Sequence, residues 1–475
     1  MTLRNGAPLL ALLALALDGC VDRGNWKAAP QLATGQLESG RTLQAAPVDA
    51  AAWPADGWWR GYGDAQLDAL VDEALAGSPT LEVAQARLRA AQAQTVAARG
   101  LRAPQVRLDA EVMRQRYPEH DLYPPPIGGS WETPASAQLD FSWTLDFWGR
   151  NRQLLAGARS GEQAALADRE AARLAIAVAV VQAYIQFDLN YALLDVTAEN
   201  LKQQQGILQL TQQRVQSGLE NVARVKQSEG SVALTRAALA YVEASIQLSR
   251  NQLADLAGAG PDRGQGLTRP QLQAPQQLAL PGLLPAQLLG RRPDVAAARA
   301  RVEAARHDIK ASEASFYPNI NLAAFAGFQA FGLSQLFDVG SRTYGVGPAL
   351  SLPVFNRDTL RGDLFARQAQ FDASVGQYNQ TLLDAVKDVA DVVANWRGLE
   401  LETSQQQIAL EAAQRSYDLT SERYRAGLDN YLSVLSSENQ VLLAQTVGAE
   451  LQARRLNYSV DLVRALGGGY APPVG

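Results

Sequence analysis

The 475-residue sequence has few of the side chains that carry out polar chemistry. It contains one cysteine and two histidines, His120 and His307. Clusters of His and Cys metal ligands and Cys–His nucleophile pairs are therefore hard to assemble, and a disulfide within the chain is excluded. The sequence also has no Gly-x-Ser-x-Gly nucleophile motif. We expect no enzyme activity, no catalytic residue, no metal site and no cofactor.

Dense basic runs are also missing. The formal net charge is −5, and arginines gather only in pairs such as Arg291-Arg292 and Arg454-Arg455. A nucleic-acid-binding surface needs a basic patch or stripe, so nucleic acid is not expected as a partner. Apolar residues make up 47% of the chain and charged residues 19%. These shares are typical of a folded protein rather than a disordered one.

Long apolar runs are absent beyond the N-terminus. No run of about 18 apolar residues, enough for a spanning helix, is found there, so any spanning part must consist of strands. Residues 1–19 have the pattern of a lipoprotein signal peptide, with Arg4 as the positive start and a short apolar stretch over Ala7–Leu17. Cys20 lies where such a signal is cut and acylated. Its acyl chains would anchor segment 20–64 in outer-membrane lipid; a buried core cysteine is the alternative.

Proline is absent from two long stretches. None of the 22 prolines falls between Ala135 and Gly260 or between Val354 and Ala471. Because proline breaks helix interiors, we expect helices over 150–216 and 357–425, each about 100 Å long. Each of these helices is expected to end at a Gly-Leu-acid-Asn turn, because glycine suits the left-handed residue after a helix and Asn can cap the next helix. Two antiparallel hairpins of this length are typical of coiled-coil rods or tubes. They turn at Gly218-Leu219-Glu220-Asn221 and Gly427-Leu428-Asp429-Asn430.

The sequence repeats itself at an offset near 210 residues. Thr211, Arg214 and Gly218-Leu219 return 209 residues later as Thr420, Arg423 and Gly427-Leu428. Such self-similarity indicates two halves of like structure. Each half is expected to run helix, strand, loop, strand, very long helix, helix. The expected divisions are the repeats 65–258 and 290–467, a Pro/Gly/Gln-rich linker at 259–289 and a tail at 468–475.

Four segments present an apolar face, with an apolar residue at nearly every second position. Their length matches membrane-spanning strands with apolar groups toward lipid and polar groups toward a lumen, although a soluble sheet packed on a helix alternates in the same way. Four strands cannot close a barrel, and open edges are not tolerated in lipid. The barrel must therefore be shared: three copies give twelve strands, two give eight. Asp140 and Asp146 are expected to line the lumen. The segments are Val106–Met113, Ala137–Asp146, Ile320–Phe328 and Tyr344–Leu352.

Several motifs follow one another along the chain. They are Trp58-Trp59-Arg60, Ser78-Pro79, Leu145-Asp146-Phe147-Trp148-Gly149-Arg150, Arg291-Arg292-Pro293-Asp294, Ala314-Ser315-Phe316-Tyr317-Pro318 and Ala465-Leu466-Gly467-Gly468-Gly469. With Cys20 they resemble the outer-membrane efflux protein family (TolC-like), and more closely its lipoprotein branch of NodT and OprM type. The resemblance implies a homotrimer with a twelve-strand transmembrane β-barrel in the outer membrane and an α-helical tunnel in the periplasm. It also implies a periplasmic membrane-fusion adaptor and an inner-membrane pump, commonly proton-driven, as partners.

The same resemblance places the periplasmic gate at the hairpin turns, where Gly218, Leu219, Gly427 and Leu428 would contact the adaptor. Family members often carry an acidic ring shortly after those glycines. Here the corresponding residues are neutral or basic, so we expect a constriction with weak cation preference or anion preference. The alternative is that Arg224 and Lys226 lie on the outer face. The gate positions are Arg224, Lys226, Gln227, Ser433 and Ser436.

Three functions stay open at this stage. The first is the outer-membrane channel of a tripartite efflux system, a passive gated duct for small molecules such as drugs or toxic organics. The second is the outer-membrane duct of a type I protein secretion system. The third is a lipid-anchored coiled-coil structural protein of the periplasm. The sequence does not name the cargo.

Overall fold

The computed structural model describes residues 24–33, 37, 53–120, 122–274, 288–353 and 355–471. The predicted lipid-attachment residue Cys20 lies outside these described residues. The chain divides into two compact units, each described here by itself. The main segments of the first unit are Arg87–Ala165 and Ala298–Tyr378. Those of the second are Leu166–Ala297 and Asn379–Gly475.

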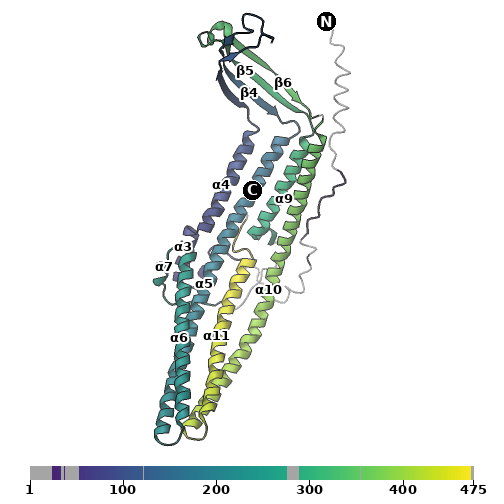
Figure 1. The fold of residues 1–475 in the computed structure, drawn as a ribbon. Coiled ribbons are helices and arrows are strands. Elements are labelled where there is room, and N and C mark those ends of the chain that lie inside the picture. The colour runs from purple at the N-terminus through teal and green to yellow at the C-terminus, as the bar shows by residue number, and fades with distance from the viewer. Residues whose placement is uncertain are drawn as a thin grey trace. The chain divides into compact units, whose positions relative to one another are not determined.

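Helices and strands occur in two series of the same order, as the repeat predicted (Figure 1). The first series is η2 (Trp58–Tyr62), α3 (Ala65–Gly77), α4 (Pro79–Gly100), β1 (Gln105–Val112), β2 (Gln115–Arg116), β3 (Trp131–Glu132), β4 (Pro134–Leu145), α5 (Arg150–Gln216) and α6 (Val222–Leu256). The second is α9 (Pro293–Ala314), β5 (Asn319–Phe331), η3 (Leu333–Gln335), η4 (Val339–Ser341), β6 (Arg342–Ser351), α10 (Arg357–Arg425) and α11 (Tyr431–Ala465). The short helices α7 (Asp262–Gln265) and α8 (Leu288–Arg291) lie between them in sequence.

The first unit contains an antiparallel sheet of order β1-β4-β5-β6. Its strands cover the four alternating segments that the sequence predicted. The register brings the apolar side chains of all four strands to one face, because Leu108 pairs with Leu139, Leu139 with Ala326, and Ala326 with Tyr344. Side chains of neighbouring strands share a face only when paired in this way. The sheet therefore has one continuous apolar face and one polar face.

The apolar face of the sheet is exposed. Leu108 has 67% of its surface accessible and Val346 has 79%, and every residue of β1 is exposed. A soluble sheet that packs on a helix buries its apolar face, so that alternative does not describe this sheet. The exposed face has the composition of a surface that contacts lipid.

The strand ends of the first unit lead into helices through defined contacts. Asp146 accepts hydrogen bonds from the backbone N–H groups of Asn151 (3.0 Å) and Arg152 (2.8 Å). It therefore caps α5 and lies outside the strand, although the alternation predicted a strand through Asp146; that it lines a lumen stays a prediction. The physical reason is that β4 ends at Leu145, so the carboxylate meets the free N–H groups of the first helical turn. Trp148 stacks on Tyr317 with a centroid separation of 4.6 Å.

The core of the second unit is built on the apolar middle of α5. This helix is the one in the described residues that is long and apolar enough to cross a membrane by length and composition. Half of its most apolar window is buried inside the protein. Val181, Tyr184 and Phe187 of that stretch pack in a cluster with Leu70 of α3 and Val460 of α11. The apolar stretch of α5 therefore serves as a core helix.

Arg292 fastens three elements of the second unit. Its guanidinium bonds to Asp294 (2.7 Å), to Asp388 of α10 (3.0 Å) and to the carbonyl oxygen of Ala465 at the end of α11 (3.2 Å). The side chain is 9% exposed, so two carboxylates and a carbonyl replace the water that the cation loses.

Gly467 follows α11 with a φ of +91°. A Cβ at this position would overlap the carbonyl oxygen of Arg291.

Replacement of Gly467 with alanine should therefore destabilise the second unit by more than about 2 kcal/mol, because it combines a left-handed φ with backbone overlap. The matched control is Gly448→Ala in α11, where nothing lies within 4 Å of the added Cβ and a gain of roughly 0.5–1 kcal/mol is expected. Thermal unfolding followed by far-ultraviolet circular dichroism would compare the two variants. Equal melting temperatures would contradict the analysis.

Candidate functional site

The two hairpin turns of the second unit have the same backbone structure. Gly218 has a φ of +73° and Gly427 a φ of +78°. The N–H of Leu219 donates to the carbonyl of Arg214, and the N–H of Leu428 donates to the carbonyl of Arg423, both at 2.8 Å. These are the bonds with which a left-handed glycine closes a helix. The predicted turns are confirmed, and both lie at the same end of the hairpins (Figure 1).

The next helix of each hairpin begins at a capping asparagine. Asn221 accepts a hydrogen bond from the N–H of Ala223 (2.9 Å), and Asn430 accepts one from the N–H of Ser433 (3.1 Å). Between the glycine and the asparagine, each turn presents one leucine with 68% of its surface exposed, Leu219 and Leu428. The repeat therefore places one exposed leucine at the same position of each turn. The assignment of these residues to adaptor contact stays a prediction.

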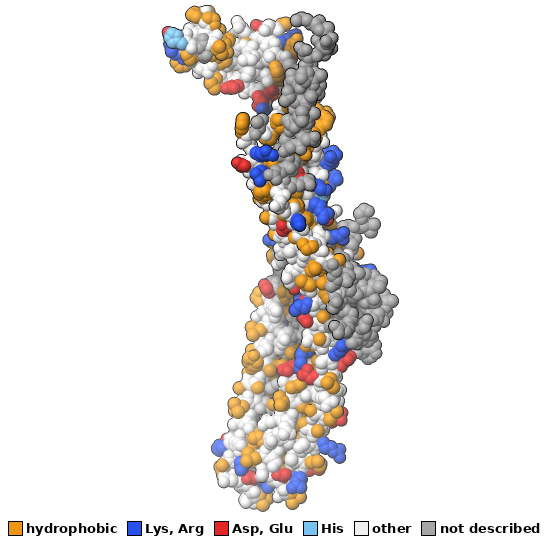
Figure 2. Space-filling view, turned by 90° about the vertical axis from the view of Figure 1, so that its right-hand side faces the viewer, with side chains coloured by type: hydrophobic (Ala, Val, Ile, Leu, Met, Phe, Trp, Pro, Cys, Tyr) orange, Lys and Arg blue, Asp and Glu red, His pale blue; other side chains and the backbone are white. Residues whose placement is uncertain are grey.

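The predicted gate residues lie just after the turns, and the two basic side chains among them bond to different kinds of group. Arg224 donates to the side-chain oxygen of Gln227 (3.0 Å), and Lys226 forms an ion pair with Glu229 (2.8 Å). The second hairpin has no basic residue at the equivalent positions, Ser433 and Ser436. Figure 2 shows both signs of charge near the hairpin turns. The positive charge of Lys226 is therefore offset locally, whereas Arg224 bonds to a neutral amide.

Ser433 has a partner within its own turn. Its hydroxyl donates to Asp429, and this bond, together with the Asn430 N–H and Arg423, lowers the pKa of the Asp429 carboxyl. Asp429 also forms an ion pair with Arg423 at 3.3 Å. The carboxylate of the second turn is thus charged and held by neighbouring groups on the same hairpin.

A buried carboxyl group was missed by the sequence analysis as a candidate site residue. Glu438 of α11 has 1% of its surface exposed. Gln204 of α5 donates to one of its oxygens at 2.8 Å, while the other oxygen has no hydrogen-bond partner. Burial raises the pKa of Glu438 to about 7, because the charged form loses its hydration without gaining a cation.

Further buried polar atoms without a hydrogen-bond partner occur on α5, α6 and α11. They are the hydroxyl of Tyr431, the hydroxyl of Ser228 and the side-chain oxygen of Gln204. Tyr431 belongs to a small apolar cluster with Ile207, Tyr424 and Val434, which joins α5, α10 and α11. Unpaired buried polar groups weaken a contact that apolar groups would otherwise hold tightly. The hairpin contact near the turns is therefore less stable than its burial implies.

The repeat gives Glu438 an equivalent in the first hairpin. Glu229 lies 209 residues earlier and is partly exposed, with Lys226 as its ion-pair partner. On each helix the carboxyl lies between two valines with the same sequence spacing. Val225 and Val232 flank Glu229, and Val434 and Val441 flank Glu438. This apolar pattern is the sequence signal that could have identified both carboxyls as candidate site residues. It does not reveal which carboxyl becomes buried.

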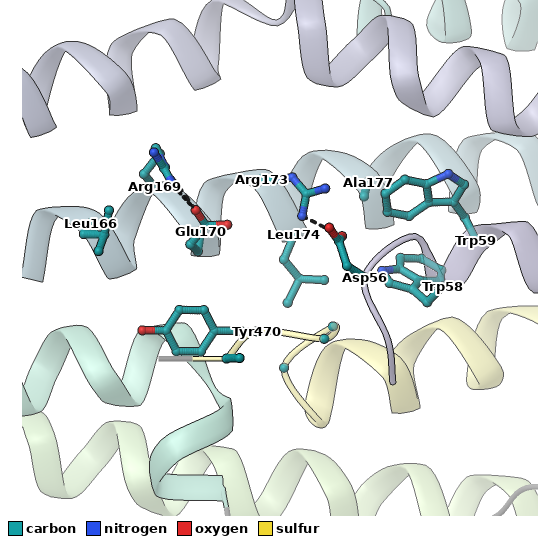
Figure 3. Close-up of a pocket in the computed structure, with 14 residues that line it drawn as sticks. Asp56, Trp58, Trp59, Leu166, Arg169, Glu170, Arg173, Leu174, Ala177 and Tyr470 are labelled. Atoms are coloured by element: carbon teal, nitrogen blue, oxygen red, sulfur yellow. Dashed lines mark hydrogen bonds and ion pairs between the residues drawn. The ribbon is translucent and has the colours of Figure 1, made fainter. Parts of the chain in front are cut away.

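A hollow of about 330 Å³ in the second unit contains charged groups paired with one another. Figure 3 shows Arg173 directed at Asp56 (2.9 Å) and Arg169 directed at Glu170, with the ring of Tyr470 across one side. Each cation is thus satisfied by a neighbouring carboxylate. Within the described ranges, no group of three or more His, Cys, Asp and Glu side chains is placed to hold a metal ion.

Comparisons with known proteins identify the family. The family model described as "Outer membrane efflux protein" matches residues 70–259 and 284–468. The chain is 39% identical to the fusaric acid resistance protein FusA of Burkholderia cepacia over 77% of this chain and 70% of that protein. It is 32% identical to the multidrug resistance outer membrane protein MdtQ of Escherichia coli O157:H7 over 98% of this chain and 97% of that protein.

A solved structure has the same fold. The outer membrane protein VceC of Vibrio cholerae superposes with a TM-score of 0.83 at 35% identity, covering 88% of this chain and all of that chain. Channels of this family are homotrimers that work with an adaptor and an inner-membrane pump. The matched segments, the helical hairpins and the four-stranded sheet lead to one conclusion: this chain belongs to the outer membrane efflux protein family.

Proposed function

We propose that three copies of this chain form the outer-membrane duct of a tripartite efflux system, through which small organic compounds leave the periplasm. The observation that carries the proposal is the four-stranded sheet with an exposed apolar face and unpaired edges at β1 and β6. An open edge is unstable in lipid because its N–H and C=O groups have no partner. Pairing β6 of one copy with β1 of the next removes both edges.

The number of copies follows from the family rather than from the residues. Two copies close eight strands and three close twelve, and both numbers occur in membrane barrels. The family is homotrimeric, so we assign twelve strands and six helical hairpins to the assembly. In this arrangement the repeats 65–258 and 290–467 each supply two strands and one hairpin, with the linker 259–289 between them and the tail 468–475 after them.

The N-terminal arm supports a role for Cys20 as the lipid anchor, following signal peptide 1–19. Four residues after Cys20 the described chain begins, and its first part is fastened to α10. The indole N–H of Trp26 donates to Asp372 (2.8 Å), the N–H of Ala29 donates to the other oxygen of Asp372 (2.9 Å), and Trp26 packs against Phe371.

The cargo and partners are proposed from the relatives. Their names refer to fusaric acid resistance and multidrug resistance, which favours drugs or toxic organics over protein substrates. A periplasmic membrane-fusion adaptor would bind the hairpin turns, and an inner-membrane pump, which we propose is proton-driven, would supply the energy. The duct itself would catalyse no reaction and need no cofactor, since a gated passive path requires only a lumen and a closure.

Single-channel current in a planar lipid bilayer tests the duct directly. We expect small, flickering conductance steps from a gate closed at rest. In a salt gradient, the reversal potential should show weak cation preference or anion preference, and Arg224→Glu together with Lys226→Glu should shift it toward cations. Lys202→Glu, farther along α5 from the turn, is the matched control and should leave it unchanged. Strong cation preference of the native channel would contradict the predicted gate, and absence of any current from folded protein would contradict the duct.

The exposed leucines of the turns should dominate adaptor affinity. Leu219→Asp and Leu428→Asp each place a charge in a contact that would be desolvated, so each should weaken adaptor binding about tenfold or more. Biolayer interferometry with the purified adaptor of the same system measures the change. Leu219→Met and Leu428→Met keep the apolar contact and should retain affinity. If both Asp variants bind as the native protein does, the turns are not the docking site.

Glu438 should make the hairpin contact depend on pH. The unfolded carboxyl titrates near 4.5 and the folded one near 7, so between these values the native state binds more protons. The free energy of unfolding therefore falls as pH rises through this window. Glu438→Gln stays neutral and should be more stable than the native protein at pH 8, by up to about 3 kcal/mol, with little difference at pH 4.

Thermal unfolding at the two pH values gives this comparison. Glu229→Gln is the matched control, because Glu229 occupies the equivalent position of the first hairpin but is exposed and paired with Lys226. Its stability should change little between the two conditions. Equal stability of the native protein and the Glu438→Gln variant at pH 8 would show that Glu438 ionises without penalty.

A further inference from the structure

The polar face of the sheet carries a partly exposed aromatic ring, that of Phe325. Polar and small residues occupy this face along β1, β4 and β6. On β5 it bears Asn321, Ala323, Phe325 and Gly327. Phe325 has 39% of its surface exposed. Phe331, the other large apolar residue on this face of β5, instead packs against the rings of Tyr117 and Tyr123 in the loop between β1 and β4.

A glycine on the neighbouring strand determines how the ring of Phe325 lies. The register pairs Phe325 of β5 with Gly345 of β6. A Cβ on Gly345 would come within 2.7 Å of the ring carbon Cε1 of Phe325. The ring therefore rests against the backbone at Gly345, in space that any other residue would fill. One side of the ring is supported by the strand and the remaining surface is available to a ligand.

On the other side of Phe325, β4 presents a carboxylate. The register pairs Asp140 with Phe325, and Arg107 of β1 with Asp140. Gln138 donates to one oxygen of Asp140 at 2.7 Å, and the guanidinium of Arg107 donates to Asp109 at 2.7 Å. Across the polar face the strands carry one cation, Arg107, against three carboxylates, Asp109, Glu111 and Asp140, a net of −2. The surroundings of Phe325 therefore favour positive charge.

These residues border a hollow of about 610 Å³. Its size falls in the range of small-molecule sites. One border is the row Arg107, Asp140 and Phe325; the opposite border is the row Gln105, Ser142 and Ala323, whose smaller side chains leave the space open. The hollow thus joins an aromatic surface and a carboxylate on the same wall.

We propose that Phe325 and Asp140 form a contact site in the lumen wall for organic cations that carry an aromatic ring. The inference rests on the proposed function, because closure of the barrel turns this face toward the lumen. Stacking on Phe325 and attraction to the ring face and to Asp140 act on the same ligand. Neutral aromatic compounds keep only the stacking contact, and cations without a ring keep only the charge contact.

Binding of ethidium, a planar aromatic cation, to the purified full-length trimer tests the site. Fluorescence anisotropy measures the dissociation constant for each variant. Phe325→Leu keeps an apolar side chain but removes the ring, and should weaken ethidium binding about fivefold. Phe325→Trp should restore it. Asp140→Asn should weaken ethidium binding while leaving the affinity for a neutral aromatic compound, such as N-phenylnaphthylamine, unchanged.

The matched control is Phe328→Leu, on the same strand but on the apolar face, where Phe328 pairs with Ala137. It should bind ethidium as the native trimer does. If Phe325→Leu binds as tightly as the native trimer, or if Phe328→Leu weakens binding equally, the contact site is overturned while the duct stands. Trimer formation and bilayer current are measured on the same samples. Loss of either would mean that the duct itself has failed, and the site with it, whereas an overturned contact site leaves both unchanged.

Discussion

The two unpaired edges of the sheet are the constraint on which the architecture depends. In the four-stranded sheet, β4 and β5 are paired on both sides, whereas β1 and β6 each have one edge whose N–H and C=O groups pair with no strand of the described chain. Each strand is also joined directly to a long helix in sequence, as in α4–β1, β4–α5, α9–β5 and β6–α10. Closure of the barrel by additional copies therefore sets the number of helices in the tunnel at the same time. The strand count and the helix count cannot vary independently.

Duplication gives the chain two hairpins with the same turns but different interiors. The glycine and asparagine of each turn act through neighbours a few residues away, so both copies keep the same local structure. Glu229 and Glu438 instead depend on the helix packed against them. Glu229 is partly exposed and forms an ion pair with Lys226, whereas Glu438 is buried beside Gln204, and burial raises its pKa. The repeat thus supplies a stable hairpin and a hairpin contact that weakens when its carboxyl ionises.

The features that the sequence predicted are those set by local patterns. The absence of proline indicated the long helices, the glycine turns marked where α5 and α10 end, and alternation marked the four strands, because these signals act within a few residues. The cap formed by Asp146 is local and was missed because the strand was expected to continue through this residue. Features that need a distant neighbour were not predictable. The burial of Glu438 depended on Gln204, and the placement of Phe325 depended on a glycine of another strand, Gly345.

A contact site within an exit duct must be weak. A wall of small and amide side chains offers a passing molecule few groups to bind, so it leaves selection of the cargo to the pump. One aromatic ring and one carboxylate per chain raise the local concentration of a matching cation without enclosing it, since the ring of Phe325 is supported on one side only. Conduction requires that entry be favourable and departure still be fast. A deeper pocket at this position would retain the compound that the system has to release.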